Sequence, residues 1–185
     1  AGADYGLAVT PYYNKPNQDG LINHFKIIAK STPLKQIIYN IPGRSIVDLS
    51  LDSFKELNKI SNIVAIKDAS NDISRPLLMR TFMKKDFNYL SGEDGTIAGY
   101  LAQGGHGCIT VVGNVAPKLT SELHKSWSLK QWKKFDKINI QLAPLSKVLF
   151  QEPNPTPTKY ALSLMGFCSE EVRAPLIALS TKTKK

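Results

Sequence analysis

The fold of this chain is indicated most clearly by residues 62–67, which read Asn62-Ile63-Val64-Ala65-Ile66-Lys67. An uninterrupted run of β-branched and apolar side chains of this length is typical of a strand that is buried on both faces of a parallel sheet. Similar apolar runs occur before and after it. We therefore expect strands at residues 5–10, 36–39, 62–67, 87–90 and 107–111.

The segments between these runs have the spacing of helices. Apolar residues recur every three or four positions, which predicts helices at residues 20–30, 50–58, 72–83 and 95–103, with Ser50 and Asp72 as N-caps. No short hairpin signal joins neighbouring runs, so the sequence predicts an α/β fold with a parallel sheet covered by helices. This sheet is either doubly wound or part of a (β/α)8 barrel. The glycine-rich loops that bind nucleotides do not follow the first strand.

The chain is basic: its 185 residues include 24 Lys+Arg and 15 Asp+Glu, a formal net charge of +9. The densest basic stretch, residues 127–137, also holds aromatic side chains, a combination found at nucleic-acid-binding surfaces. However, Phe135, Ile138 and Leu142 continue a helical spacing, so we interpret the stretch as an amphipathic helix and expect no nucleic acid partner. Helical patterns continue to the C-terminus, with expected breaks at Pro144 and at residues 153–157.

The cysteine content and the hydropathy bear on the compartment. Cys108 and Cys168 lie far apart and lack both metal-site spacing and a disulfide framework, so we expect a reducing cytoplasm. No apolar run approaches the length of about 18 residues that predicts a membrane-spanning helix. The opening residues show no secretory signal, and we expect no membrane partner.

Unusual polar residues follow three neighbouring strands. Tyr12 to Tyr39 is a separation of 27 residues and Tyr39 to Lys67 one of 28, so each interval spans one strand–helix unit. Equivalent positions on parallel strands lie at the same edge of the sheet. In a barrel the C-terminal edge is where active sites are built. We therefore expect these side chains to contribute to a site there.

Lys67 is the most informative of these residues, because it ends an apolar strand. Lysine is rarely buried, since removing an ammonium group from water is costly. A structural interpretation is that Lys67 extends to solvent or pairs with Asp68. A functional interpretation is an amine whose pKa is lowered by an apolar site, which can attack a ketone and form a Schiff base. That chemistry is typical of class I aldolases and needs neither a metal nor a cofactor.

Tyr39 and Arg44 fit the same chemistry. Tyr39 ends the neighbouring strand, and its phenol can donate and accept the protons moved during Schiff-base formation. Arg44 lies in the following loop, where a guanidinium can bind a substrate carboxylate with two hydrogen bonds. The alternatives are a tyrosine that packs its ring in the core and an arginine that lies in solvent.

Five segments resemble one family in order and spacing, the dihydrodipicolinate synthases within the N-acetylneuraminate lyase-like class I aldolases. They are Val9-Thr10-Pro11-Tyr12-Tyr13-Asn14-Lys15-Pro16, Tyr39-Asn40-Ile41-Pro42-Gly43-Arg44, Ile66-Lys67-Asp68-Ala69-Ser70, Leu90-Ser91-Gly92-Glu93-Asp94 and Glu152-Pro153-Asn154-Pro155-Thr156-Pro157-Thr158-Lys159. The resemblance covers essentially the whole chain. It implies a lyase of lysine and diaminopimelate biosynthesis that condenses pyruvate with aspartate 4-semialdehyde.

The resemblance assigns catalytic roles to three residues. Lys67 matches the lysine that forms the Schiff base with pyruvate, so that no separate cofactor is needed. Tyr39 matches the tyrosine of the proton relay. Tyr13 matches a tyrosine that reaches across a dimer interface into the relay of the neighbouring subunit.

Four further residues match binding or interface positions of the family. Arg44 matches the arginine that recognises the carboxylate of the semialdehyde, and it favours the synthases over the neuraminate lyases, which lack it. Gly92 and Ile109 match the backbone that lines the pyruvate pocket. Tyr12 matches an interface tyrosine near the lysine feedback site.

The resemblance also implies how the chain relates to a complete barrel. A (β/α)8 barrel takes about 250 residues, and the resemblance begins at what corresponds to strand four, so we expect a barrel that lacks its first three βα units. The expected domains are a partial barrel at residues 1–127 and a C-terminal helical region at residues 128–185. The expected partner is either further copies, as in the family's homotetramer, or a complementary N-terminal chain.

Two other readings stay open at this point. In one, the chain is an inactive or partner-dependent remnant that serves only as a structural or interaction module. In the other, it is a related pyruvate-dependent aldolase or lyase that acts on a different aldehyde.

Overall fold

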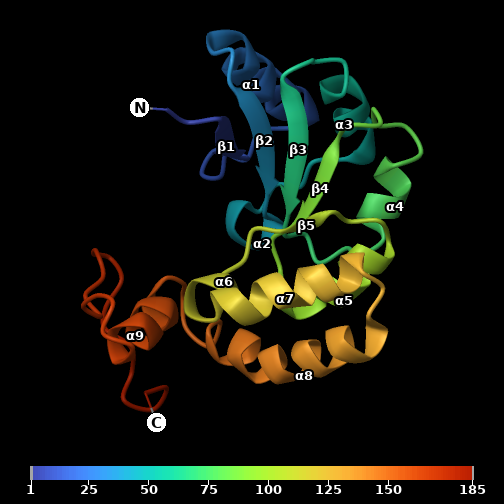
Figure 1. Ribbon diagram of the computed structural model, residues 1–185. Helices are drawn as coiled ribbons and strands as arrows, with labels where there is room; N and C mark the ends of the chain where they lie inside the picture. Colours follow the sequence, from blue (N-terminus) through green and yellow to red (C-terminus); the bar gives the residue numbers. More distant parts are fainter. Residues whose placement is uncertain (1, 185) are drawn as a thin grey trace. The chain divides into compact units, whose positions relative to one another are not determined.

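A parallel sheet organises the first of two compact units, Ala1–Ile109 and Thr110–Lys185, into which the chain divides. The computed structural model describes residues 2–184 (Figure 1). The strands pair in the order β1-β2-β3-β4-β5, and every neighbouring pair is parallel. Their bounds are β1 Tyr5–Val9, β2 Lys35–Asn40, β3 Ile63–Asp68, β4 Asn88–Ser91 and β5 Gly107–Cys108. The predicted α/β fold with a parallel sheet is confirmed, although the fifth strand is shorter than expected.

Helices connect the strands of this unit. Their bounds are α1 Gln18–Ser31, α2 Pro42–Ser45, α3 Leu51–Leu57, α4 Arg75–Met79 and α5 Ile97–Ala102, with a 3-10 turn η1 at Asp94–Thr96. The Ser50 hydroxyl accepts a hydrogen bond from the backbone N–H of Ser53 and so caps α3, as predicted.

The helix predicted at residues 72–83 is wrong in its extent, and Asp72 does not cap it. The carboxylate of Asp72 accepts the backbone N–H of Ser74 in a turn before α4. A helix that started at Asp72 would place the ring of Pro76 against the carbonyl of Asp72, four residues earlier. At the second position of α4, Pro76 has no such conflict.

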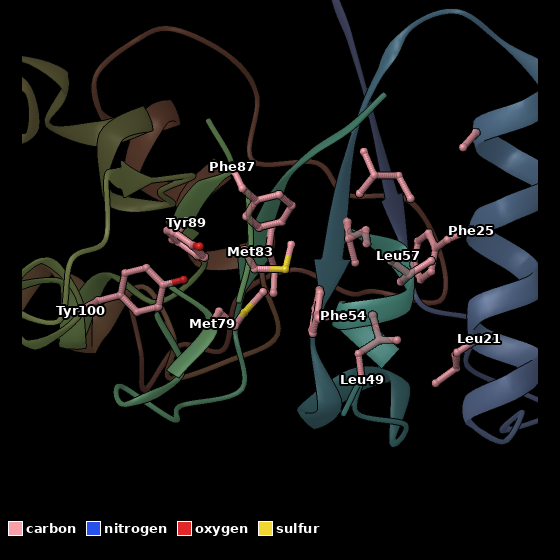
Figure 2. Packing of buried hydrophobic residues seen from close by; sticks show 14 residues of the cluster. Leu21, Phe25, Leu49, Phe54, Leu57, Met79, Met83, Phe87, Tyr89 and Tyr100 are labelled. Atoms are coloured by element: carbon pink, nitrogen blue, oxygen red, sulfur yellow. The ribbon is translucent and has the colours of Figure 1, made fainter. Parts of the chain in front are cut away.

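The core of this unit lies between the sheet and its helices (Figure 2). Successive side chains of a strand point to opposite faces, so Ile38 and Ile66 point into this core, while Leu7 and Val9 lie exposed on the other face of the sheet. The buried side chains labelled in the figure are Leu21, Phe25, Leu49, Phe54, Leu57, Met79, Met83, Phe87, Tyr89 and Tyr100. One face of the sheet is therefore closed by helices, and the other is open along β1.

Replacing Phe54 with alanine is expected to destabilise the first unit strongly. The Phe54 side chain is 0% exposed, and removing a buried phenyl ring costs about 3–5 kcal/mol in lost burial and cavity formation. Chemical denaturation followed by circular dichroism measures this free energy. The matched control is Ile27→Ala on α1, where the side chain is 59% exposed and the expected change is below about 0.5 kcal/mol. Equal losses in the two variants would contradict this description of the core.

The second unit consists of helices within the described residues: α6 Val112–Val115, α7 Pro117–Ser128, α8 Trp132–Val148 and α9 Thr156–Leu164. Phe135, Ile138 and Leu142 are buried along α8, which confirms the amphipathic interpretation of the basic stretch. The break expected at Pro144 is wrong, because α8 continues through it. The proline leaves the carbonyl of Ile140 without its helical partner, and Ile140 is exposed, so water can satisfy that oxygen.

None of the helices in residues 2–184 combines the length and the apolar character needed to cross a membrane.

Candidate active site

Tyr39 and Lys67 lie side by side at the C-terminal edge of the sheet. The register of the strands places Val9 beside Tyr39, Tyr39 beside Lys67, and Lys67 beside Leu90. The Nζ atom of Lys67 lies 4.0 Å from the centroid of the Tyr39 ring, a favourable contact between a cation and an aromatic face. Both side chains are half-buried. The expected grouping of Tyr39 with Lys67 is confirmed, but the equivalent position expected for Tyr12 is wrong. β1 ends at Val9, which stands beside Tyr39, so Tyr12 lies three residues further on, in the loop after the strand.

The structure excludes the ion pair between Lys67 and Asp68 that the sequence left open. Asp68 follows Lys67 on β3 and therefore points to the other face of the sheet, where it is buried. Its ionic partner is Arg75, whose Nε atom lies 3.6 Å from the Asp68 Oδ2 atom. Lys67 is thus available on the open face.

Burial sets the protonation of both side chains. It lowers the pKa of Lys67 below its ordinary value, an effect that Asp94 and Glu93 oppose and that Arg44 reinforces. Burial raises the pKa of Tyr39, while the positive charge of Arg44 works in the opposite direction. Lys67 is therefore more easily deprotonated than an ordinary lysine, and the phenol of Tyr39 keeps its proton. An amine that can attack a carbonyl stands beside a group that can donate a proton.

Lys67 is expected to react as a free amine at a lower pH than an ordinary lysine. Its rate of acetylation by acetic anhydride, mapped by mass spectrometry and referred to Nα-acetyl-lysine, should rise with a midpoint below 10.5. Because the folded state holds this proton less tightly than the unfolded chain, the free energy of unfolding should also increase as the pH rises between the two pKa values. A labelling midpoint at or above 10.5 would contradict the burial described here.

Arg44 brings a fixed positive charge to a neighbouring cavity of about 410 Å³. It lies in α2, directly after β2, and its charge acts on both Tyr39 and Lys67. Apart from Ser45, the rest of the lining is apolar or aromatic and consists of Leu7, Val9, Tyr12, Tyr39 and Ile41. An arginine at an apolar concavity is suited to bind a carboxylate, since few other polar groups compete for it.

The backbone of Gly92, which directly follows the neighbouring strand β4, lies close to the Lys67 side chain. Its N–H donates a hydrogen bond to the Asp68 carbonyl at 2.6 Å, which continues the ladder beyond β4. A Cβ atom at Gly92 would lie 2.8 Å from the Cβ of Ala69 and 3.3 Å from the Cε of Lys67. Only glycine lets the backbone approach this closely. Ile109 lies one strand further on and donates its N–H to the Ser91 carbonyl at 2.9 Å.

Tyr12 and Tyr13 follow β1 and are exposed. Tyr12 lines the cavity but is 64% exposed, and Tyr13 is 93% exposed. Residues 2–184 thus bring together Lys67, Tyr39, Arg44 and Gly92, whereas Tyr13 does not join them within one chain. Its role stays a prediction that concerns a second copy.

The sequence interpretation gave no role to Glu93 and Asp94, whose charges both act on Lys67. Burial raises the pKa of Glu93, and the neighbouring Asp94 raises it further. These residues directly follow β4, so the reasoning from strand ends would have found them. Among residues 2–184, no three His, Cys, Asp or Glu side chains gather in a way that could hold a metal ion.

Solved structures of similar proteins share this architecture. The chain matches dihydrodipicolinate synthase from Aquifex aeolicus with a TM-score of 0.96 at 38% identity, over 99% of this chain and 63% of that one. It also matches the chloride-inhibited synthase from Acinetobacter baumannii, a structure described as complexed with pyruvate, with a TM-score of 0.93 at 41% identity and coverage of 99% and 63%.

Sequence comparisons agree with the structural ones. The 4-hydroxy-tetrahydrodipicolinate synthase of Bradyrhizobium diazoefficiens is 48% identical over 184 residues, which cover 100% of this chain and 62% of that protein. The chain thus spans about 62% of the length of the curated relatives that it matches. The sequence model described as the dihydrodipicolinate synthetase family matches residues 1–185. A match over this range, together with a lysine, tyrosine and arginine held at one edge of a parallel sheet, shows that the chain belongs to the dihydrodipicolinate synthetase family.

Proposed function

We propose that this chain carries the Schiff-base site of a 4-hydroxy-tetrahydrodipicolinate synthase, which condenses pyruvate with aspartate 4-semialdehyde. The observation that carries the proposal is the half-buried Lys67 amine, with its lowered pKa, 4.0 Å from the ring of Tyr39. The name of the relative from Bradyrhizobium diazoefficiens and the pyruvate in the structure from Acinetobacter baumannii support this reaction and this substrate.

The first half of the reaction takes place at Lys67. Its neutral amine attacks the ketone carbon of pyruvate, and the resulting carbinolamine loses water to give an iminium ion. Tyr39 is placed to give a proton to the departing hydroxyl group. The iminium then accepts electrons as the methyl carbon loses a proton, which leaves a nucleophilic enamine. No separate cofactor is needed, because the protonated imine is itself the electron sink.

The second half requires an aldehyde with a carboxylate. Arg44 can hold that carboxylate at the cavity beside Tyr39, so that the aldehyde carbon faces the enamine. The backbone around Gly92 and Ile109 would form the wall of the pyruvate pocket. The arginine favours aspartate 4-semialdehyde over the sugar aldehydes of related lyases.

The architecture supports a larger fold. We infer that β1 to β5 correspond to strands four to eight of a (β/α)8 barrel, because the synthase from Aquifex aeolicus aligns with 99% of this chain over 63% of its own length. The exposed Leu7 and Val9 face the side that such a barrel would enclose. A complementary N-terminal chain that carries the missing strands would cover that face. In a homotetramer, Tyr12 and Tyr13 would lie at an interface between copies.

The proposed reaction belongs to lysine and diaminopimelate biosynthesis in the cytoplasm. The free thiol of Cys168 suits that reducing compartment.

Borohydride trapping tests the proposed function. The purified chain is incubated with pyruvate, reduced with sodium borohydride and weighed by mass spectrometry, and the adduct is mapped by proteolysis. The proposal expects one pyruvate-sized adduct, located at Lys67. Aspartate 4-semialdehyde added before the borohydride should lower the yield of this adduct, because it consumes the enamine, whereas a sugar aldehyde should not. The opposite result is a folded chain that forms no adduct, either alone or after addition of a chain that supplies the missing strands. That result would favour the alternative in which the chain serves only as a structural or interaction module.

A further inference from the structure

A second pair of side chains lies directly behind Tyr39 and Lys67. Asn40 and Asp68 are the next residues of β2 and β3, and they also stand opposite one another in the register. Because side chains alternate along a strand, this pair points to the helix-covered face. Asn40 is fully buried and Asp68 nearly so. Because the two pairs share the same strand ends, any rotation of those ends would displace both pairs at once.

Arg75, on α4, forms an ion pair with Asp68, one member of this second pair. Its side chain is 8% exposed, and its Nε atom lies 3.6 Å from the Asp68 Oδ2 atom. Its Nη2 atom donates to both carboxylate oxygens of Asp48, at 2.8 Å and 3.1 Å. Its Nη1 atom donates to the backbone carbonyl of Leu49 at 2.7 Å. One guanidinium therefore contacts both β3 and the loop that leads to α3.

Asp48 and Leu49 extend the connection to β2. The Nδ2 atom of Asn40 donates to Asp48 at 2.7 Å, and the Oδ1 atom of Asn40 accepts the Leu49 N–H at 3.2 Å. Asp48 lies four residues after Arg44, on the same connection between β2 and α3. The network consists of Arg75, Asp68, Asp48, Asn40 and the backbone of Leu49.

We propose that Arg75 is a positioning residue, which holds the strand ends that carry Lys67 and Tyr39, and the connection that carries Arg44, in one fixed arrangement. The proposal rests on the proposed function for the roles of those three residues. Arg75 itself lies on the other face of the sheet and acts only through its partners. Its contribution is to keep the amine, the phenol and the guanidinium of the site at their mutual distances.

Lysine cannot replace Arg75 in this network. The planar guanidinium presents donors in several fixed directions, and here they serve the Asp48 carboxylate and the Leu49 carbonyl. The Nε atom makes no hydrogen bond but lies 3.6 Å from the buried Asp68 carboxylate, where its charge compensates that of the acid. An ammonium group is a single point of charge that reaches at most part of this set. Arg75→Lys therefore keeps the positive charge but removes the set of directed hydrogen bonds. The variant thus distinguishes a role in positioning from a role in compensating the charge of Asp68.

The test compares Arg75→Lys and Asp48→Asn with the native chain. The matched control is Lys55→Met, which removes one side of an exposed ion pair with Asp52 at 2.7 Å. Three quantities are measured: the melting temperature, the pH profile of Lys67 acetylation, and the rate constant of pyruvate trapping at saturating pyruvate. All are recorded at a temperature at which each variant is folded.

The proposal expects Arg75→Lys to lower the trapping rate constant roughly tenfold, because small misplacements of reacting groups cost one to two orders of magnitude. The Lys67 acetylation midpoint should move towards that of an ordinary lysine as the strand end loosens. Asp48→Asn should change both quantities in the same direction, and Lys55→Met should change neither.

A lower melting temperature with unchanged trapping and acetylation would overturn the proposal, since Arg75 would then be structural only. Failure of both network variants to fold would overturn it for the same reason. If the native chain traps no pyruvate, either alone or with a chain that supplies the missing strands, the proposed function fails. The acetylation profile of Lys67 still decides whether Arg75 positions it.

Discussion

Replacing Lys67 with arginine is expected to reduce pyruvate trapping to background. A guanidinium keeps its charge at every accessible pH and has no neutral amine with which to attack a ketone. The substitution retains a cation beside the ring of Tyr39, so the local packing changes little. The measurement is the mass of the chain after incubation with pyruvate and borohydride.

Lys35→Arg is the matched control for this variant. Lys35 lies on β2, with its Nζ atom 5.7 Å from the centroid of the Tyr5 ring, so it repeats the lysine–tyrosine contact at the other end of the strand. It is expected to trap pyruvate like the native chain. An adduct that persists in Lys67→Arg would show that another amine is the nucleophile.

Replacing Tyr39 with phenylalanine is expected to lower the rate constant of adduct formation by about 10²–10⁴, the usual contribution of a positioned proton donor. The ring that contacts Lys67 is retained, so the effect isolates the hydroxyl group. Its pKa is raised by burial, which keeps the proton on the phenol at neutral pH. The rate is followed by quenching with borohydride at successive times.

Tyr5→Phe serves as the control for the hydroxyl, because Tyr5 stacks with a lysine on the same sheet away from the site. It is expected to leave the rate unchanged. A rate in Tyr39→Phe within about twofold of the native value would exclude Tyr39 from proton transfer and leave it as a packing residue.

The helix boundaries show how far local patterns extend. The cap of α3 at Ser50 follows from a hydroxyl that accepts an N–H three residues later, a purely local interaction. The predicted start of α4 is wrong because the pattern at residues 72–83 runs across Pro76, whose ring excludes a helix start at Asp72. The predicted break at Pro144 is wrong in the opposite sense, since α8 continues through the proline beside the exposed Ile140.

The order of strands and helices, and the edge at which Tyr39 and Lys67 meet, follow from the sequence pattern alone. Parallel strands place equivalent residues at the same edge of the sheet, so the spacing of 28 residues groups these two side chains. The same argument fails for Tyr12, because β1 ends at Val9. Which side chains stand behind Tyr39 and Lys67 depends on the three-dimensional packing. Arg75 is separated by 27 residues from Asp48, and no periodicity relates them. Their pairing arises because α4 packs over the sheet and the buried carboxylate of Asp68 requires a cation there, which is a property of three-dimensional packing.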